Sequence, residues 1–437
     1  MAGTEEPRLK SDDDFVAVKV APSRLTVPVA ADGSYSVVVD GETWFRSGPT
    51  YFRHSGREYS SDTREDQALV LSSSTNTHGT SWDAMTITWK TNDGIPFVTS
   101  VNVSAGFAVF TQRFPDAISG ASTGDRDSII SSFPNLKMAA KETKGVVSFK
   151  GAGDYQVHIG NWSSATGISP PDLITSGIGD TCPTVVFSKD MSTSLVLSAF
   201  SNFMAHNQKF GAGDRNPTLM PHPTLAFGVM GEVDDIPANY TTSTIISLGS
   251  GMSSTMDTWG DRLLSSHGKK ERYDYRRDLA TQKLGYATDN GAFYYYNPEP
   301  GKTYQQTMVD VKAYADNVGL PYHYTILDSW WYYQDPKTEG VTTWDPRPDV
   351  FPGGLGAVYN KTGWQQQLHN RYWAATNTYR SKYKFICDGR DGADVCVPNS
   401  KMFWVDLMKN KSDTGMFMIV STRLALGHLQ MLKVAGR

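Results

Sequence analysis

The stretch Tyr322-His-Tyr-Thr-Ile-Leu-Asp328-Ser-Trp-Trp331 is typical of a buried β-strand that ends in a carboxylate and two indole rings. An earlier stretch, Leu284-Gly-Tyr-Ala-Thr-Asp289, has the same character and runs on into a loop that extends to about residue 296. The residues between the two stretches predict a helix, so the whole segment is expected to be a strand–helix–strand unit. Two strands joined by such a crossover pair in parallel, and the crossover is right-handed.

The predicted helix has recognisable signals at both ends. Thr303 and Gln306 have the spacing of a capping-box pair, and Gly319 with Pro321 provides the stop. Between these signals, apolar side chains recur at spacings of four and three, at Tyr304, Met308, Val311, Ala315 and Val318. The pattern predicts one face packed against the sheet.

Polar and aromatic residues collect where the predicted strands end. Further strand-like stretches follow at residues 364–372 and 415–420, with a helix expected around 402–409. Carboxyl ends of parallel strands meet at one edge, which forms the active-site face of βα-barrels. Carboxylates, donors and indole faces at this edge suit a polyhydroxylated ligand. The predicted substrate-binding residues are Asp289, Asp328, Trp330, Trp331, His369 and Arg371. The alternative for the two aspartates is that each caps the next helix.

The first half of the chain has a different pattern. From Phe15 to about Gly260, short runs rich in β-branched residues alternate with turn signals such as Asp32-Gly33, which predicts an antiparallel β-sandwich. The expected fold class is multidomain β plus α/β. Residues 1–260 are predicted to form the N-terminal sandwich, 261–280 a helical, charged linker, and 281–437 the first part of a (β/α)8 TIM-type barrel.

Composition restricts the function. The 437 residues include 41 Lys and Arg against 45 Asp and Glu, a net charge of −4 that disfavours a nucleic-acid or membrane-surface binder. No apolar run reaches the ~18 residues that a membrane span requires. The acidic start, Met1 to Asp14, lacks the apolar core of a signal peptide, so the chain as written is expected to be cytoplasmic. Secretion or a lysosomal-type location stays open if the start is mispredicted.

Other chemistries find little support. Gly301-Lys302-Thr303 resembles part of a phosphate-binding loop, but the required earlier glycine is Tyr296 and two nearby prolines remove backbone donors. A nucleotide enzyme acting through Lys302 is therefore the weakest alternative. The nine histidines show no metal-binding spacing, and serine-hydrolase and dinucleotide-binding motifs are absent. No cofactor and no metal are expected.

The three cysteines, Cys182, Cys387 and Cys396, cannot build a disulfide framework. Cys387 and Cys396 bracket a turn-rich segment, so one loop-closing disulfide and free thiols both stay open.

Four of the segments together resemble the α-galactosidase, raffinose synthase and α-glucosidase-like glycoside hydrolases. They are Gly285 to Tyr296, Leu327-Asp-Ser-Trp-Trp-Tyr-Tyr333, Asp349-Val-Phe-Pro-Gly-Gly-Leu355 and Leu368-His-Asn-Arg-Tyr-Trp373. The resemblance covers residues 280–410 best and implies a (β/α)8 barrel behind a sandwich, with retaining action on α-linked sugars. Asp328 would match the strand-two carboxylate that binds sugar hydroxyls, with Trp330 and Trp331 shaping the pocket.

The chain departs from this pattern at its catalytic carboxylates. Retaining hydrolysis needs a nucleophile, expected after strand four, and an acid/base from strand six. Asp413 is the last acid of the sequence and precedes strand four. The chain is either a non-catalytic homologue or a truncated gene product, and the change of composition after Val420 favours the second.

The expected function is that of a glycoside hydrolase-like protein with little or no activity as it stands and with an α-linked sugar as its ligand. The rival is a non-catalytic carbohydrate-binding or scaffold protein that uses the sandwich. The sugar, its linkage and the oligomeric state stay open.

Overall fold

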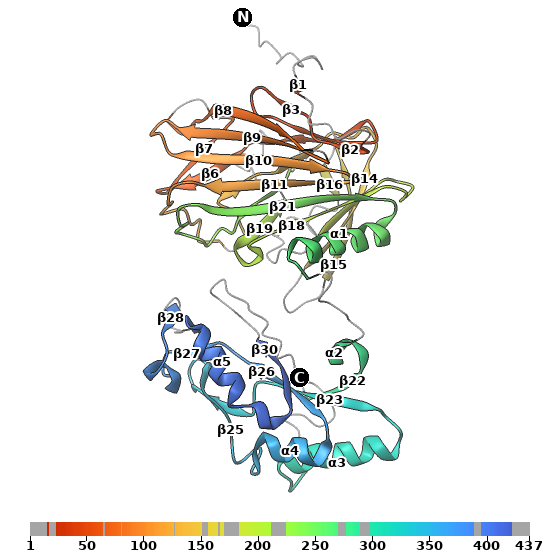
Figure 1. Ribbon diagram of the computed structural model, residues 1–437, viewed down its shortest axis with the longest axis vertical. Coiled ribbons are helices and arrows are strands. Elements are labelled where there is room, and N and C mark those ends of the chain that lie inside the picture. Colours follow the sequence, from red (N-terminus) through yellow and green to blue (C-terminus); the bar gives the residue numbers. More distant parts are fainter. Residues whose placement is uncertain are drawn as a thin grey trace, which may run out of the picture. The chain divides into compact units, whose positions relative to one another are not determined.

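The computed structural model describes residues 15–16, 23–63, 66–79, 81–125, 127–150, 156–164, 167–169, 183–210, 224–269, 277–288, 298–388 and 395–421. The chain divides into two compact units, Met1–Lys270 and Glu271–Arg437 (Figure 1). Strands dominate the first unit, whereas the second unit combines strands with helices of comparable extent. Within the described ranges, no helix is long and apolar enough to cross a membrane.

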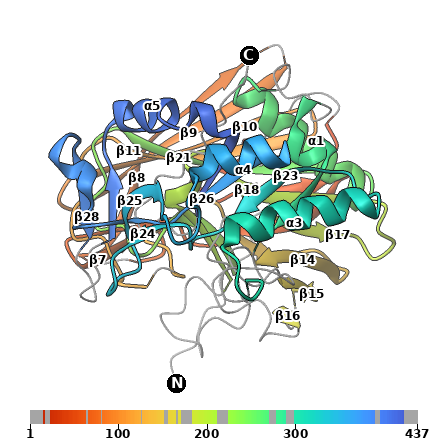
Figure 2. The same ribbon diagram turned by 90° about the horizontal axis from the view of Figure 1, so that it is seen from below.

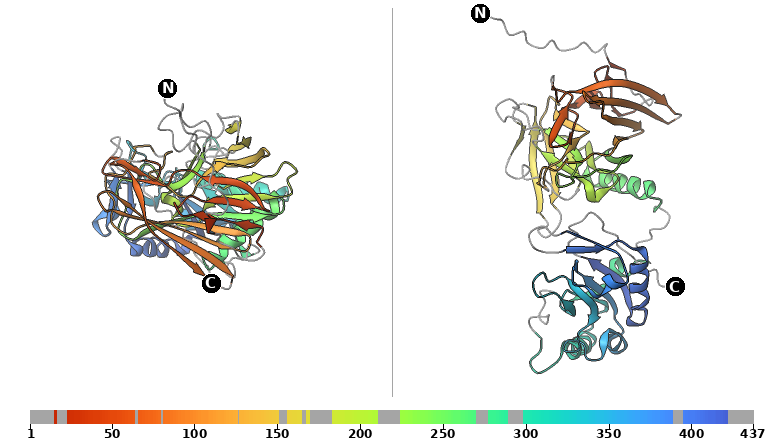
Figure 3. Two further views of the ribbon diagram at one scale, coloured as in Figure 1. Left: turned by 90° about the horizontal axis from the view of Figure 1, so that it is seen from above. Right: turned by 90° about the vertical axis from the view of Figure 1, so that its left-hand side faces the viewer.

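The first unit contains a ten-stranded antiparallel sheet whose strands β8 to β11 are orange in Figure 3. In spatial order it comprises β16 (Gly167–Ser169), β15 (Gln156–Ser163), β14 (Lys144–Lys150), β17 (Thr184–Phe187), β18 (Ser194–Ala199), β21 (Tyr240–Gly249), β11 (Phe107–Phe114), β10 (Pro96–Ser104), β9 (Trp82–Thr91) and β8 (Leu69–His78).

Smaller antiparallel sheets complete this unit. The six-stranded one has the order β19 (His206–Phe210), β20 (Thr224–Val229), β13 (Asn135–Met138), β5 (Glu42–Ser47), β4 (Ser36–Val39) and β2 (Leu25–Thr26). The others are β12 (Ser131–Ser132), β6 (Tyr51–His54) and β7 (Arg57–Ser60), and the pair β1 (Phe15–Val16) and β3 (Val29–Ala30).

The two large sheets contribute to one hydrophobic core. On β10, buried and half-buried residues alternate along the strand, which is the period of a sheet with one face turned inward. Phe97 and Val101 of this strand belong to the same buried cluster as Val37 and Phe45 of the six-stranded sheet. The strand pattern of the sequence therefore reflects which face of each sheet is buried.

Helix α1 (Met252–Ser266) belongs to the first unit. The Trp259 indole donates to Ser198 Oγ at 2.8 Å, and the Arg262 guanidinium donates to the carbonyl of Gly106 at 2.8 Å. Both partners lie in or beside the ten-stranded sheet. The predicted boundary at residue 260 falls inside this helix, so residues 261–266 are packed structure and not a connection.

The second unit is built on a parallel sheet with the order β22 (Leu284–Ala287), β23 (Tyr322–Leu327), β26 (Gln365–Asn370) and β30 (Met416–Ser421). Helices α3 (Tyr304–Asn317), α4 (Gly354–Thr362) and α5 (Lys401–Lys409) connect successive strands, and α3 and α4 lie side by side (Figures 1 and 2). A short helix, α2 (Leu279–Gln282), precedes β22. The parallel strand–helix–strand unit is confirmed, but the described strands form an open sheet and not a closed barrel.

Helix α3 differs from its prediction in two details. The Thr303 hydroxyl accepts the backbone N–H of Gln306, as a cap should, but the Gln306 side chain donates to Asp310 Oδ1 at 2.9 Å, so only half of the capping box forms. Val318 lies just beyond the helix and is 47% exposed, so it does not join the buried face. Helix α4 was not predicted, because it lies in a segment rich in Pro and Gly.

The two long connections after β23 and β26 fold into a second, five-stranded sheet. Its order is β24 (Tyr332–Gln334), β25 (Val341–Pro346), β27 (Trp373–Ala374), β29 (Val395–Pro398) and β28 (Phe385–Asp388). Short 3-10 helices lie at Thr378–Ser381 and Ser412–Thr414, and another, in the first unit, at Phe203–Ala205.

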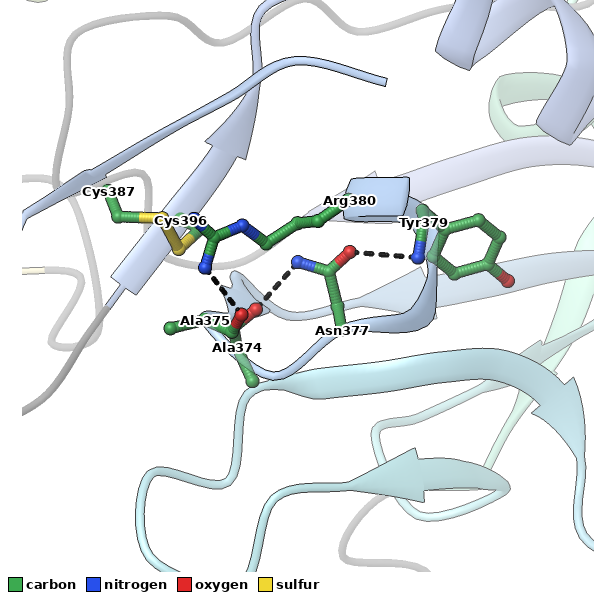
Figure 4. Close-up of a disulfide and its surroundings, with 7 residues drawn as sticks. All are labelled: Ala374, Ala375, Asn377, Tyr379, Arg380, Cys387 and Cys396. Carbon is green, nitrogen blue, oxygen red and sulfur yellow. Dashed lines mark hydrogen bonds between the residues drawn. A yellow bond between two sulfur atoms is a disulfide. The ribbon is translucent and has the colours of Figure 1, made fainter. Parts of the chain in front are cut away.

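A disulfide joins the last two strands of this small sheet. Cys387 and Cys396 are direct cross-strand partners and are bonded to each other (Figure 4). Nearby, the Asn377 amide donates to the carbonyl of Ala374 at 2.6 Å, and Arg380 donates to that of Ala375 at 2.6 Å. Of the two alternatives left open by the sequence, the structure has the disulfide. Cys182 lies outside the described residues.

Candidate functional site

The carboxyl ends of β23 and β26 bring two of the predicted site residues together. Leu327 pairs with Leu368 in the parallel register, so Asp328 and His369 are the next residues on neighbouring strands. Their side chains meet, with His369 Nδ1 4.0 Å from Asp328 Oδ1. The expectation that strand ends would gather polar side chains holds for this pair.

Asp328 is held by its backbone and keeps part of its carboxylate in contact with solvent. Its N–H donates to Thr288 Oγ1 at 3.2 Å, and Thr288 Oγ1 in turn donates to the carbonyl of Ile326 at 2.7 Å. The Asp328 side chain is 25% exposed, and its Oδ1 accepts the N–H of Ser329. No helix begins there, since the next described helix along the chain is α4 at Gly354. The helix-cap alternative is therefore wrong for Asp328.

His369 is buried beneath the same edge. Its Nδ1 lies 3.1 Å from the hydroxyl of Tyr332, and that hydroxyl accepts the backbone N–H of Arg371 at 3.1 Å. Burial lowers the pKa of His369 to about 4, while the nearby Asp328 carboxylate opposes this shift. The imidazole is therefore neutral near pH 7. Burial also raises the pKa of Tyr332 far above its usual range, so the phenol keeps its proton.

The Arg371 side chain forms an ion pair with Glu339. The guanidinium side chain is 30% exposed and the glutamate 65%, so the pair lies in partial contact with solvent. Such an exposed pair is weak and can exchange partners at low cost. Since Nη1 of Arg371 binds Glu339, the other donors of the guanidinium can serve a ligand without loss of this pair.

The two tryptophans after β23 lie in the core of the second unit. Trp330 is 5% exposed and contacts Tyr304 with a centroid distance of 4.4 Å, and Trp331 is fully buried 5.3 Å from Trp344. Neither ring offers an open face for stacking on a sugar. They support the strand end from behind, and the Trp344 indole does the same by donating to the carbonyl of His369 at 3.0 Å.

Some residues of the site lie beyond what the sequence indicated. Tyr332, in β24, contacts His369, and Glu339, in the turn between β24 and β25, binds Arg371. Tyr332 lies inside the segment from Leu327 to Tyr333 that carries the family resemblance, whereas no motif marks Glu339. Asp289 lies outside the described residues. The described part of the chain holds no group of three or more His, Cys, Asp or Glu that could bind a metal ion. Lys302 is bound by Glu299 at 2.9 Å and Asp310 at 2.7 Å, which leaves it poorly suited to hold a phosphate.

No family model matches the chain, and no curated protein matches its sequence. Among solved structures, the chain is similar to an alpha-N-acetylgalactosaminidase from Bifidobacterium bifidum, with 9% identity, a TM-score of 0.55 and coverage of 93% of this chain and 70% of that one.

Two further solved structures belong to the same comparison. A GH36 alpha-galactosidase variant from Geobacillus stearothermophilus in complex with stachyose has 10% identity, a TM-score of 0.50 and coverage of 93% of this chain and 65% of that one. A Glycoside Hydrolase Family 97 enzyme variant from Pseudoalteromonas has 10% identity, a TM-score of 0.54 and coverage of 93% and 66%. At this identity the likeness concerns the fold alone: the chain is similar in fold to these β-rich, multidomain glycoside hydrolases.

Proposed function

We propose that this chain is a glycoside hydrolase-like protein of the retaining α-glycosidase type, which binds α-linked sugars at the carboxyl ends of β23 and β26. In this proposal the first unit is a β-sandwich and the parallel sheet is the first part of a (β/α)8 barrel. The proposed ligand-binding residues are Asp289, Asp328, His369 and Arg371, with Trp330 and Trp331 supporting them from the core.

The observation that carries the proposal is the Asp328–His369 pair at one sheet edge. A carboxylate that is one-quarter exposed can accept hydrogen bonds from sugar hydroxyls, and the contact of 4.0 Å places an imidazole beside it. Ligands of open α/β sheets bind outside the carboxyl ends of the strands. The glycosidase fold of the solved structures described above is consistent with this location.

We further propose that the 437-residue chain hydrolyses glycosides slowly or not at all. A double displacement needs a carboxylate nucleophile and a second carboxyl group about 5 Å away. Asp413 is the last acidic residue of the sequence and lies before β30, so no acid of this chain follows the strand that is expected to carry the nucleophile.

The binding proposal is tested with Asp328→Asn in the full chain. Methyl α-D-galactopyranoside and methyl α-D-glucopyranoside are the probes, and calorimetry measures the affinity. Loss of a charged hydrogen-bond acceptor costs roughly 1.5–3 kcal/mol, so we expect the affinity for the bound glycoside to fall by about tenfold or more.

The matched control is Asp316→Asn, which removes an exposed carboxylate of α3 in the same unit. It should leave the affinity unchanged. Equal affinity of wild type and Asp328→Asn would overturn the proposed site. Release of nitrophenol from an aryl α-galactoside or α-glucoside well above a heat-treated sample would overturn the proposed lack of hydrolysis.

A further inference from the structure

The first unit contains a cavity of about 620 Å³ that the proposed site in the second unit does not use. Two hairpin turns and the start of β14 form its walls. One turn joins β4 to β5 through Asp40 and Gly41, and the other spans residues 188–193 between β17 and β18. Ligand sites commonly have volumes of 300–1,000 Å³, so this cavity has room for a small molecule.

The Arg24 side chain ties the two turns together. It binds both carboxylate oxygens of Asp40 at 2.7 Å, and it also donates to Thr193 Oγ1 at 3.3 Å. Asp40 has a positive φ of 50°, and Gly41 follows it with 81°, which is the backbone of a tight hairpin. The two turns that line the cavity are therefore linked by a bidentate ion pair, and the first of them has the backbone of a tight hairpin.

A buried cation lies in the wall of the cavity. The Lys144 side chain is 4% exposed, its ammonium donates to Glu42 Oε2 at 3.0 Å, and it lies 4.4 Å above the ring of Trp44. An ammonium group has three donors, and Glu42 is its hydrogen-bond partner among the described residues. Burying a charge is costly unless it is paired. Because Lys144 also lines the cavity, its remaining donors are available to an oxygen atom of a molecule bound there.

Other acceptors line the same cavity. Glu42 and Glu142 line the cavity, as does Asp190, whose Oδ1 accepts from Ser188 and Ser192 in the second turn. These hydrogen bonds, of which that from Ser188 contributes most, lower the pKa of Asp190 to about 2. This carboxylate is therefore charged near neutral pH. Lys189 is a second cation of the lining.

The mixture of charges restricts the class of ligand. Glu142 and Asp190 repel an anion, whereas Asp40 and Glu42 are already paired with Arg24 and Lys144, and the buried ammonium of Lys144 repels a metal cation. A hydroxyl group, in contrast, accepts from an ammonium and donates to a carboxylate at the same time. Neighbouring hydroxyls on one ring would satisfy both kinds of wall group, because the Lys144 ammonium, a donor, lies 3.0 Å from the Glu42 carboxylate, an acceptor.

We infer that this cavity is a second binding site, for a neutral polyhydroxylated ligand such as a monosaccharide or a cyclic polyol, with Lys144 as its central donor. This inference rests on the first unit alone and does not depend on the proposed function of the second.

The test uses the full chain with Asp328→Asn already in place, so that the strand-end site is weakened. Saturation-transfer NMR measures binding of three probes, D-galactose, D-glucose and myo-inositol. We expect at least one of them to bind this background, and Lys144→Met to lower its affinity by about tenfold or more, which is the usual size of a charged hydrogen bond. Lys137→Met, an exposed lysine of β13, is the matched control and should change nothing.

Three results would overturn the inference. The first is that none of the three probes binds to the Asp328→Asn background, which leaves the proposed function intact. The second is that Lys144→Met binds as well as its background. The third is that inorganic phosphate or Ca²⁺ binds in a Lys144-dependent way. If Lys144→Met does not fold, Glu42→Gln replaces it, because that change keeps the ammonium and removes only its charged partner. A folded Glu42→Gln chain with unchanged affinity would likewise contradict the site.

Discussion

The second unit combines two sheets of opposite character that meet at one site. The parallel sheet, β22 to β30, supplies Asp328 and His369 directly from its strand ends. The small mixed sheet, which is made from the connections after β23 and β26, supplies Tyr332 from β24 and Glu339 from the turn between β24 and β25, and these hold the imidazole and the guanidinium. The comparison indicates that the parallel sheet provides the polar groups and the small sheet fixes their positions.

The largest expected effect concerns pH and the parallel sheet. His369 has a pKa of about 4 when folded against an ordinary value of 6.5, so between these values the unfolded chain binds a proton that the folded chain does not. Stability is therefore fully present above about pH 6.5 and falls toward pH 4, by at most about 1.4 kcal/mol per pH unit from this residue.

His369→Gln tests this effect. Chemical unfolding of wild type and variant at several pH values should show that the wild type loses more stability on acidification. Another buried histidine, His206 in the first unit, has its pKa lowered to about 3 by burial and keeps its own contribution in both proteins. Parallel pH profiles for the two chains would mean that His369 takes up its proton without cost and that the strand edge is not as closed as described.

The second unit shows which features the sequence could predict and which it could not. Hydrophobic periodicity and cap signals predicted β22, α3 and β23, because those elements are local and their spacing reflects burial. Register then follows, and it brings Asp328 next to His369. The sequence could not predict that Tyr332 would bond to His369, since this contact joins residues 37 positions apart through a sheet assembled from two separate connections.

The two tryptophans after β23 show the same limit of prediction from local sequence. The residues Trp330 and Trp331 follow a strand that ends in a carboxylate, which is as suitable for a stacking surface as for a core. Their burial depends on Tyr304, Phe351 and Trp344, which come from other elements. Local sequence therefore identifies an aromatic strand end, and only tertiary packing decides which way the rings turn.

The next expected effect concerns the small sheet. Cys387→Ser removes the disulfide between β28 and β29. The two cysteines are nine positions apart in the sequence. Closing a loop of this length stabilises a chain by about 2.5 kcal/mol in the chain-entropy treatment. Without reductant, peptides covering β27 to β29 should therefore exchange hydrogen faster in the variant than in wild type. Exchange in β22 and β23 should change little. Wild type treated with a reductant is the control and should behave like the variant. Equal exchange in all three samples would show that the small sheet does not depend on the disulfide.

The smallest expected effect concerns the hydrogen bonds between the two sheets. Tyr332→Phe keeps the ring but removes the hydroxyl that contacts His369 Nδ1 and accepts the N–H of Arg371, each at 3.1 Å. Two lost hydrogen bonds at a buried position cost about 1 to 2 kcal/mol, measured as a change in the free energy of unfolding. Tyr314→Phe, at an exposed position on α3, is the control and should be neutral. A neutral Tyr332→Phe would indicate that the small sheet covers the strand ends without positioning them.

The most direct test of the account is a crystal structure of the full chain soaked with methyl α-D-galactopyranoside or methyl α-D-glucopyranoside. We expect a glycoside at the carboxyl ends of β23 and β26, with at least one hydroxyl within hydrogen-bond distance of the Asp328 carboxylate. A glycoside found only in the cavity beside Lys144 would support the second site and contradict the strand-end site. A crystal with neither position occupied, at a glycoside concentration well above the affinity measured in solution, would contradict both.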